Sequence, residues 1–212
     1  MTKMVRREDE TAKLPKERLL DVAERLFSSR GFAAVTLRDI GQELSLSHAS
    51  LYRHFPGGKE ELFIRVMERS ILRHGEALAQ RLEGQDGDIR GALRGVARWL
   101  LSQPPLDLIR MAQSDMPVLK TEDARRIMDL MHGQVLLRVH TALQAADEAG
   151  EIHCANPALV GGALIGMIES FHSIPNFAVR DSRQDMAEDM IDILLRGMDY
   201  RGFKKSESWE EI

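Results

Sequence analysis

The chain is poor in the features that mark secreted and membrane proteins. Its 212 residues include one cysteine, Cys154, so no intramolecular disulfide can form and a reducing compartment is expected. No apolar segment follows the first methionine, so no secretory signal is expected, and the longest apolar run, 159–168, is too short to span a bilayer. We therefore expect a cytoplasmic protein that does not enter a membrane.

Motifs of enzymes and metal sites are missing as well. The sequence has no glycine-rich phosphate loop, no nucleophile motif and no HExxH pair. Five possible metal ligands are scattered over its second half: His132, His140, His153, Cys154 and His172. His132 and His140 are eight residues apart, a spacing that does not form a known ligand pair. We therefore expect no enzyme activity, no metal and no cofactor.

Charge is distributed unevenly in an otherwise ordinary globular composition. The chain is 43% hydrophobic, 29% charged and 5% aromatic, with a formal net charge of −4. Residues 1–70 carry 13 Lys and Arg against 11 Asp and Glu, whereas residues 71–212 carry 16 against 22. A weakly basic front on an acidic body fits a protein that places one end on a polyanion, although so small an excess discriminates little.

The stretch 36–63, TLRDIGQELSLSHASLYRHFPGGKEELF, predicts two short helices joined by a tight turn and followed by a longer helix. Thr36 is expected to cap the first helix, with Asp39 returning a bond in an acidic form of the capping box. Ser47 is expected to cap the second helix, 48–54. That helix is short and polar, so it suits a groove better than a protein core. Two such helices form a helix-turn-helix arrangement, whose second helix fits the DNA major groove.

Periodicity alone leaves an ordinary helical hairpin with a solvated face equally open. The specific string separates the two: S-x-x-S-L-Y-R-H-F-P followed by G-K-E-E-L-F resembles the DNA-binding domain of the TetR family of bacterial transcriptional regulators. The resemblance extends from about residue 14 to residue 69 and includes the run FSSRGF at 27–32. Two positions depart from the family pattern. Ser45 replaces a common turn glycine and is expected to enter the left-handed region, and the turn at 56–59 is one residue longer than usual.

The resemblance implies that the second helix reads bases and that flanking residues hold phosphates. The DNA-contacting residues it implies are Thr36, Arg38, Ser47, His48, Ala49, Ser50, Tyr52, Arg53, His54 and Lys59. Arg38 is expected at a guanine or a phosphate, His48 and Ser50 at base edges, and Ala49 at a thymine methyl group. Tyr52, His54 and Lys59 are expected to clamp phosphates, and Thr36 to add a hydroxyl contact.

Hydrophobic spacing predicts an all-α fold of about nine helices. A flexible arm (1–13) precedes a three-helix helix-turn-helix DNA-binding domain (14–70) and a helical ligand-binding and dimerisation domain (71–212). The first helix is expected to end at Arg30-Gly31, and later helices are expected at 59–84, 89–102, 106–113, 122–149, 158–171 and 186–198. Basic residues of the arm either reach a minor groove or belong to an inactive terminus.

The last two predicted helices suggest self-association. The helix at 158–171 is apolar nearly all round, the last helix carries a narrower apolar stripe, and both resemble the surface through which TetR-family members form homodimers. The alternative is that both helices are core of a monomer. A dimer presents two reading helices about 34–36 Å apart, as a palindromic double-stranded DNA operator requires.

The resemblance also implies a pocket for a small-molecule effector that releases DNA. Candidate pocket residues are polar or pliable ones at positions expected to point inward: Trp99, Arg110, Met111, Met128, Met131, His132, Glu169, Phe171 and His172. Ordinary core packing is the alternative for each. The sequence thus indicates a ligand-responsive DNA-binding regulator, with repression as the usual outcome. The alternative function is a helical-bundle module for protein interaction or metal binding, without sequence-specific DNA binding.

Overall fold

The computed structural model describes residues 16–83, 88–107, 110–179 and 181–198, so the predicted arm 1–13 lies outside the described residues. The described chain contains nine α-helices and no strand. The helices are α2 (Lys16–Ala34), α3 (Leu37–Leu44), α4 (His48–His54), α5 (Gly58–Leu82), α6 (Ile89–Ser102), α8 (Thr121–Met131), α9 (Leu137–Glu148), α10 (Pro157–Ser170) and α11 (Arg183–Met198). Shorter turns are η1 (Met111–Asp115), η2 (Met116–Val118), η3 (His132–Leu136), η4 (Phe171–Ser173) and η5 (Asn176–Ala178). The all-α prediction is confirmed, and none of the described helices is long and apolar enough to cross a membrane.

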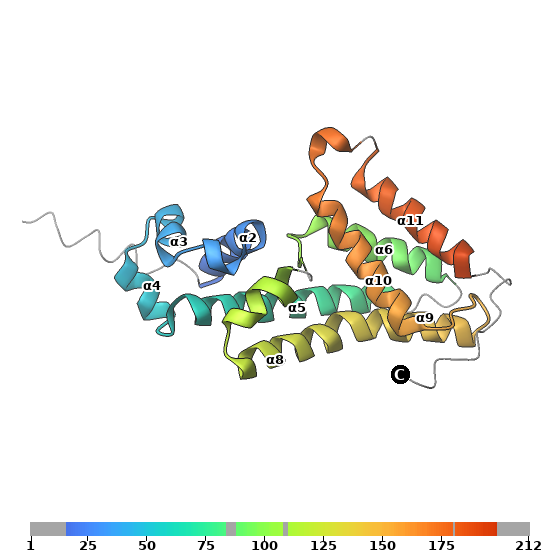
Figure 1. Ribbon diagram of the computed structural model, residues 1–212, viewed down its shortest axis with the longest axis horizontal. Coiled ribbons are helices and arrows are strands. Elements are labelled where there is room, and N and C mark those ends of the chain that lie inside the picture. Colours follow the sequence, from blue (N-terminus) through green and yellow to red (C-terminus); the bar gives the residue numbers. More distant parts are fainter. Residues whose placement is uncertain (1–15, 84–87, 108–109, 180, 199–212) are drawn as a thin grey trace, which may run out of the picture.

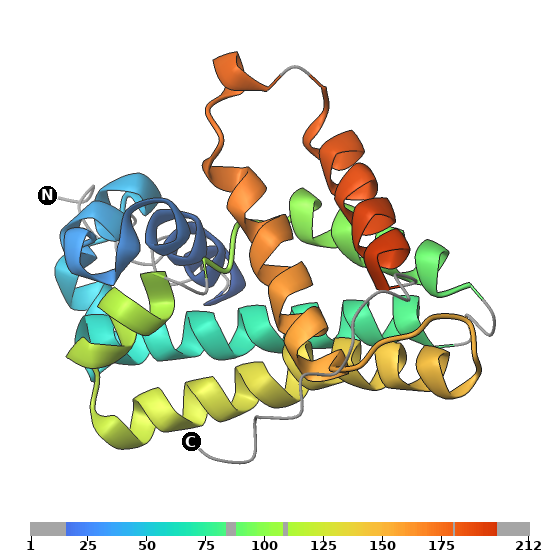
Figure 2. The same cartoon turned by 45° about the vertical axis from the view of Figure 1, so that its right-hand side comes forward.

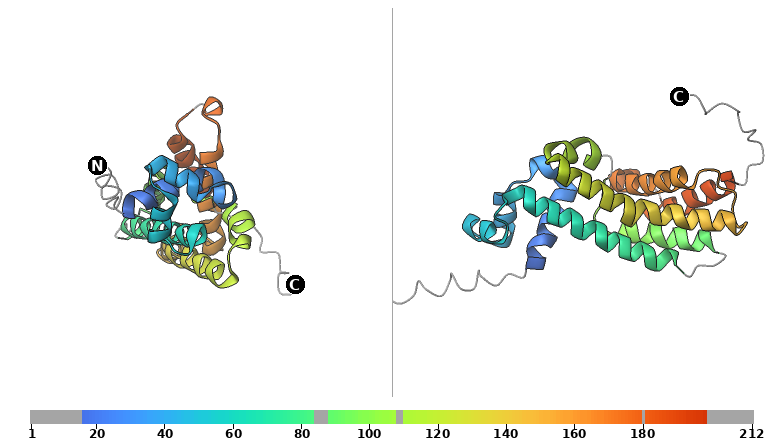
Figure 3. Two further views of the ribbon diagram at one scale, coloured as in Figure 1. Left: turned by 90° about the vertical axis from the view of Figure 1, so that its left-hand side faces the viewer. Right: turned by 90° about the horizontal axis from the view of Figure 1, so that it is seen from below.

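Helix α5 is the spine of the molecule (Figure 1). It runs along the long axis from the small N-terminal helices into the larger group of C-terminal helices. In this view α8 and α9 run below α5, while α6, α10 and α11 lie above it. Seen from below, α6 lies beside α5 and α10 lies beside α9 (Figure 3). We call α2, α3 and α4 with the start of α5 the head, and the remaining helices the body.

The head has an aromatic core that holds α2 on α5. Phe27 packs edge-on against Phe63 with ring centroids 5.1 Å apart, and Phe32 lies 4.9 Å from Phe63. Gly31 has φ 78° and ψ 165°, which breaks the helical conformation near the predicted end of the first helix. A residue with a side chain rarely adopts this conformation, so glycine lets the chain turn back towards the core through Phe32.

The predicted helix at 122–149 is observed as one continuous helical run, α8–η3–α9, with an unpredicted π-helical segment in the middle. Its buried residues recur every four positions: Ile127, Met131, Val135, Val139 and Leu143. A spacing of four exceeds the 3.6 residues of an α-helical turn, so the stripe drifts around a regular helix. The wider π turn at η3 takes up part of this drift, so the five side chains stay buried along the whole run.

The predicted helix at 106–113 is wrong in its bounds. Leu106 and Asp107 are not helical, and the helical turns are η1 and η2 instead. Asp107 has φ 44°, which no right-handed helix accepts, and its N–H and that of Leu106 bond to the carboxylate of Glu169. Pro117 lies in the first positions of η2 rather than stopping a helix, because a first turn needs no N–H there. The contact from α10 outweighs local helix propensity.

Candidate nucleic-acid interface and body cleft

The first helix of the hairpin, α3, begins at the predicted capping box. The hydroxyl oxygen of Thr36 accepts the N–H of Asp39 at 3.2 Å, and the Asp39 carboxylate accepts the N–H of Thr36 at 2.8 Å. The Thr36 hydroxyl also donates to Asp39 at 2.6 Å, and this bond is the main reason that the pKa of Asp39 is lowered. The start of α3 is therefore set by two residues three positions apart.

The turn between α3 and α4 depends on two small residues. Ser45 adopts the predicted left-handed conformation with φ 55° and ψ 34°. Gly41, which the sequence reading passed over, allows the close approach of the two helices: a Cβ there would lie 3.0 Å from the carbonyl oxygen of Leu46 and 3.3 Å from Leu51. A larger residue at position 41 would push α4 away from α3.

Helix α4 turns its apolar side inward and its polar side to solvent. Leu51 is 1% exposed and Phe55, at its C-terminal end, is also 1% exposed, so both anchor the helix in the head. The side chains of His48 and Tyr52 lie on the surface with their rings 4.8 Å apart, and Tyr52 is 43% exposed. Arg53 is exposed beside them. The polar residues predicted to contact DNA therefore share an accessible face at the far end of the molecule (Figure 1).

The other residues predicted to contact DNA differ in their solvent exposure and in their hydrogen bonds within the protein. Thr36, Arg38 and Ala49 are exposed. The hydroxyls of Ser47 and Ser50 lie 3.0 Å apart, and Ser47 also caps α4 by accepting the N–H of Ser50 at 3.2 Å.

Two residues at the C-terminal side of α4 are less free. His54 is half-buried. Lys59 is half-buried too, and its Nζ donates to the carbonyl oxygen of Phe32 at 2.9 Å and lies 4.1 Å from the centre of the Phe32 ring. Lys59 must leave Phe32, or share its ammonium group, to reach a phosphate.

The longer turn before α5 is accommodated by Gly58, which has φ 70°. A Cβ on Gly58 would stand 3.5 Å from Cε1 of Tyr52, so the turn packs directly beneath that ring. The turn therefore supports the ring of Tyr52.

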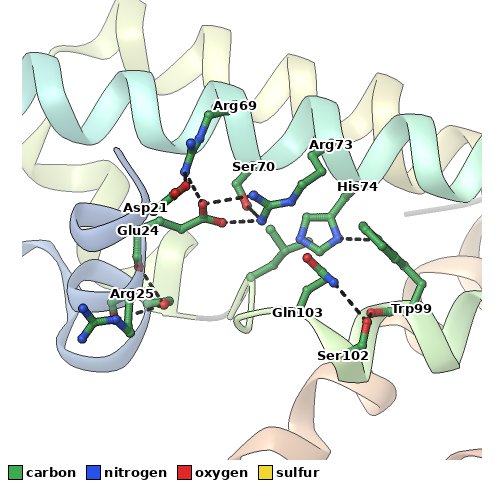
Figure 4. A network of polar contacts seen from close by, with 12 residues as sticks. Asp21, Glu24, Arg25, Arg69, Ser70, Arg73, His74, Trp99, Ser102 and Gln103 are labelled. Carbon is green, nitrogen blue, oxygen red and sulfur yellow. Dashed lines mark hydrogen bonds and ion pairs between the residues drawn. The ribbon is translucent and has the colours of Figure 1, made fainter. Parts of the chain in front are cut away.

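The head and the body are held together by a buried carboxylate on α2. Glu24 is 6% exposed, and it accepts hydrogen bonds from Arg69 at 2.8 Å and Arg73 at 3.1 Å, both on α5 (Figure 4). Burial raises the pKa of Glu24, but the hydrogen bonds and charge of Arg73, with Ser70 and Arg69, lower it below its ordinary value overall. We call this set of contacts the Glu24 clasp. The signal in the sequence was a charged residue on the inward stripe of the first helix, between Ala23 and Phe27.

A second clasp joins the end of α2 to η1, and Figure 2 shows these two segments side by side. Asp115, 4% exposed, accepts the N–H of Phe32 at 3.0 Å. Arg110 donates from Nη1 to the carbonyl oxygen of Ser28 at 2.8 Å, and its Nε lies 3.5 Å from Asp115. The sequence reading missed Asp115, because nothing in its local pattern distinguishes it from a solvated acid.

Beside this second clasp lies a cleft of about 360 Å³ between the end of α2, the segment after α6 and the end of α10. Its lining residues are Ser28, Ser29, Pro105, Asp107, Arg110, Gly166, Glu169, Ser170, His172 and Ser173. Three of the predicted pocket residues, Arg110, Glu169 and His172, meet here from two distant parts of the chain. We call this the junction cleft.

Comparison with known proteins places the head in a family. Residues 19–66 match the family model for bacterial regulatory proteins of the tetR family. The head therefore matches this family. The HTH-type transcriptional regulator LmrA of Bacillus subtilis is 42% identical over 52 residues, which cover 24% of this chain and 28% of LmrA. TtgR of Pseudomonas putida is 25% identical over 186 residues, which cover 82% of this chain and 87% of TtgR. Both relatives are transcriptional regulators rather than enzymes, in agreement with the class predicted from the sequence.

Solved structures of TetR-family regulators share the whole fold. PfmR from Thermus thermophilus has a TM-score of 0.67 and 24% identity, with 91% of this chain and 99% of PfmR covered. AibR, in complex with isovaleryl coenzyme A and operator DNA, has a TM-score of 0.69 and 21% identity, with coverage of 84% and 97%. The described chain, body included, therefore has the same helical fold as these structures.

The remaining predicted pocket residues do not reach the junction cleft. Met111, Met131 and Phe171 are buried in the core. Met128 is 40% exposed and His132 is also exposed, so neither points inward as expected. Each follows a buried residue of the long helix by one position, which turns it about 100° away from the buried stripe.

Trp99 serves another buried group instead. Its Nε1–H donates to Nδ1 of His74 at 3.2 Å, and His74 is fully buried on α5 (Figure 4). Burial lowers the pKa of His74 to about 4, so the ring is neutral near pH 7. The pair ties α6 to the spine.

Glu169 and His172 have a Glu-x-x-His spacing, which in some helical bundles marks a metal ligand pair. Within the part of the chain that the structure describes, no three His, Cys, Asp or Glu side chains come close enough to hold a metal ion. The lining of the junction cleft is mainly polar.

Proposed function

We propose that this chain is a TetR-family DNA-binding transcriptional regulator that binds a palindromic operator as a homodimer and releases it when a small-molecule effector binds the body. The observation that carries the proposal is α4: a helix of two turns, anchored by Leu51 and Phe55, that presents His48, Tyr52 and Arg53 to solvent. Repression is the expected outcome. We propose a DNA-binding domain at 14–70 and a ligand-binding and dimerisation domain at 71–212, with the boundary inside the continuous helix α5.

We assign the DNA contacts by position on the exposed face of the head. His48, Ala49 and Ser50 lie at the start of α4, the part of a recognition helix that enters the major groove first. Thr36, Arg38 and Tyr52 flank them as backbone contacts, and Ser47, Arg53, His54 and Lys59 complete the footprint. Phosphate contacts set the register, whereas the contacts from the start of α4 select sequence.

The dimer is proposed to form through α10 and α11. Leu159 on α10 is 68% exposed and Ile193 on α11 is 64% exposed, so each helix offers a large aliphatic side chain to a partner protomer. Ile193→Asp should convert the dimer to a monomer at micromolar concentration, as measured by sedimentation or light scattering. Leu137→Asp, at a 42% exposed leucine on α9, is the matched control and should remain dimeric. A variant at Ile193 that sediments as the parent chain does would rule out this surface.

Effector release is proposed to act through the spine and the two clasps. Because α5 is continuous from the head to the body and Glu24 and Asp115 tie α2 to the body, a ligand that shifts the body shifts the head as well. In one arrangement of the dimer the two heads fit the operator, and in another their spacing does not fit it. An effector that binds the second arrangement more tightly lowers operator affinity by the difference between its binding free energies for the two arrangements. AibR, which has this fold, was solved with both a small molecule and operator DNA.

The test begins with selection of bound fragments from genomic DNA, followed by fluorescence anisotropy on the selected duplex at several salt concentrations. We expect saturable binding that weakens steeply as salt rises, because Lys and Arg release counterions from the phosphates they neutralise. Enrichment of no sequence, or binding that is insensitive to salt, would contradict DNA binding and favour a protein-interaction role.

A further inference from the structure

The junction cleft is placed where a ligand would touch the head and the body at once. Ser28 and Ser29 come from α2 in the head, whereas Arg110, Glu169 and His172 come from the body. A volume of about 360 Å³ falls in the range of small-molecule sites. A ligand bound there would contact both the head and the body and could change the angle between them.

The one guanidinium group in the cleft is already neutralised. Arg110 donates to the carbonyl oxygen of Ser28, lies 3.4 Å from Asp107 and lies 3.5 Å from the buried Asp115. Burial also disfavours a positive charge on His172 by lowering its pKa, and its Nε2 lies 3.3 Å from the carbonyl oxygen of Leu100. The charge left over is negative: the carboxylate of Glu169 has no cation beside it among the described residues.

Among the residues that the structure describes, only one of the two carboxylate oxygens of Glu169 is hydrogen-bonded. Its side chain is 6% exposed, and Oε2 accepts the N–H of Leu106 at 2.8 Å and of Asp107 at 3.4 Å. The second oxygen, Oε1, is buried without a hydrogen-bond partner in the described parts of the chain. Burial, with a smaller contribution from the charge of Asp107, raises the pKa of Glu169 to about 7. A buried carboxylate in this state gains stability from any cation that reaches it.

We propose that the junction cleft binds a compact organic cation, such as an amidinium, guanidinium or primary ammonium group, and that Glu169 is the residue that holds its charge. Asp107 faces the same space and adds a second carboxylate, while the hydroxyls of Ser28, Ser29, Ser170 and Ser173 suit the polar remainder of the ligand. The cation and carboxylate make charge-assisted hydrogen bonds, which are stronger than those between neutral groups. This assignment names the chemical class of the effector and, for its link to DNA release, rests on the function proposed above.

Three ligands of one shape and different charge test the proposal: benzamidine, which is cationic at pH 7.5, neutral benzamide, and anionic benzoate. Isothermal titration on the full chain should show binding of benzamidine, at least tenfold weaker binding of benzamide, and no binding of benzoate. Absence of benzamidine binding up to about 10 mM, or tighter binding of benzoate, would overturn the proposal.

Two variants localise the site. Glu169→Gln should weaken benzamidine binding at least tenfold and bring it to the level of benzamide. Asp107→Asn should weaken it severalfold, and asparagine tolerates the φ of 44° at this position, so this variant keeps the test valid if Glu169→Gln folds poorly. Glu76→Gln, at an exposed glutamate on α5, is the control and should bind as the parent chain does. Unchanged affinity in both cleft variants would place the ligand elsewhere.

Anisotropy on the selected operator with and without benzamidine separates the two proposals. Weaker operator binding in the presence of benzamidine, lost in Glu169→Gln, supports the cleft as the effector site. Benzamidine binding that leaves operator affinity unchanged overturns the regulatory role of the cleft but not DNA binding. A chain that binds no duplex at all contradicts the proposed function, whereas the titration with the three ligands still decides the cation site.

Discussion

The hairpin of the head and the junction cleft are built in opposite ways. The hydrogen bonds that cap and turn the hairpin join residues close in sequence: Thr36 with Asp39, Ser47 with Ser50, and Ser45 with the end of α3. The cleft is shaped by hydrogen bonds between residues 63 and 83 positions apart, Leu106 with Glu169 and Phe32 with Asp115. A site built from local contacts keeps its shape when its surroundings move, whereas a site built across an interface changes with that interface.

This difference suits the two tasks proposed for the molecule. A surface that reads base edges must be rigid, because a small shift of the recognition helix changes which side chains meet the bases. A surface that senses a ligand must have two arrangements that differ in free energy, and an interface between head and body provides them. The clasps at Glu24 and Asp115 consist of a few polar contacts. They stabilise one position of the head relative to the body, and a second position stays within reach.

The largest effect should come from opening the core of the hairpin. Leu51→Ala removes a side chain that is 1% exposed beneath α4, and it should lower the free energy of unfolding by roughly 2–5 kcal/mol. Urea unfolding followed by circular dichroism measures this change. The comparison variant Leu137→Ala, at a 42% exposed leucine, should change stability by less than about 1 kcal/mol. Equal losses in the two variants would mean that α4 is not anchored through Leu51.

The next effect concerns the pH dependence of the cleft. Because the folded pKa of Glu169 is raised to about 7 from 4.5, the folded state keeps a proton that the unfolded state has lost between these values. Stability from this group is therefore present below pH 4.5 and is lost as pH rises through 7, by at most roughly 3 kcal/mol. Glu169→Gln should remove this loss, which melting temperatures between pH 5 and pH 8 would show.

His74 provides the contrast, because its effect has the opposite sign. Its folded pKa of about 4 lies below the ordinary 6.5, so the unfolded state binds the extra proton, and stability is lost as pH falls from 6.5 towards 4. His74→Gln should reduce the loss of melting temperature as pH falls from 6.5 towards 4, whereas Glu169→Gln should reduce the loss as pH rises from 4.5 to 7. A change of the same sign in both variants would mean that the Glu169 carboxyl group is not held as described.

A smaller effect should follow from releasing the Glu24 clasp. Glu24→Gln leaves Arg69 and Arg73 without their buried carboxylate, and these arginines are partly solvated, so the expected loss of stability is about 1–3 kcal/mol. Operator affinity should fall as well, because the head is less well positioned on α5. Glu43→Gln, which removes an exposed pairing with Arg25 on the head surface, should leave both quantities within about 0.5 kcal/mol. An effect of the same size at both positions would argue against a special role for the clasp.

The smallest effects should distinguish base contacts from phosphate contacts within the hairpin. His48→Ala should change which sequences are preferred, by about 1–3 kcal/mol at one base pair, because it removes a proposed base contact. Tyr52→Ala should weaken binding to all sequences by a similar factor, because it removes a proposed phosphate contact. Competition between operator and mixed DNA measures both. If neither variant alters DNA retention, the exposed face of α4 is not the reading surface.

Most of the hairpin was predictable because its determinants are short-range. The capping box at Thr36, the left-handed Ser45 and the cap at Ser47 are all observed where the sequence placed them. The need for glycine at position 41 was not predictable, because it depends on how closely the turn carbonyl of Leu46 approaches α3. The bounds of α6 were also correct, since its apolar spacing and the prolines after it are unambiguous.

In the body, prediction failed where a distant residue intervenes. The segment after α6 has helical spacing, yet Glu169 accepts two of its N–H groups, and Leu106 and Asp107 are not helical. Pocket residues were chosen by polarity at inward positions, and Met128 and His132 lie one position off the buried stripe of their helix. Polarity alone does not reveal which side of a long helix meets a cavity.

Local sequence was sufficient for the helices, their caps and the hairpin, because each depends on hydrogen bonds and apolar spacing within a few residues. Only the packed molecule decided that Ser28, Arg110 and Glu169 surround one cleft, and that Glu24 and Asp115 are buried. The reason is physical: burial and charge pairing between distant segments have no local pattern, and they exist only after the chain has brought α2, η1 and α10 together.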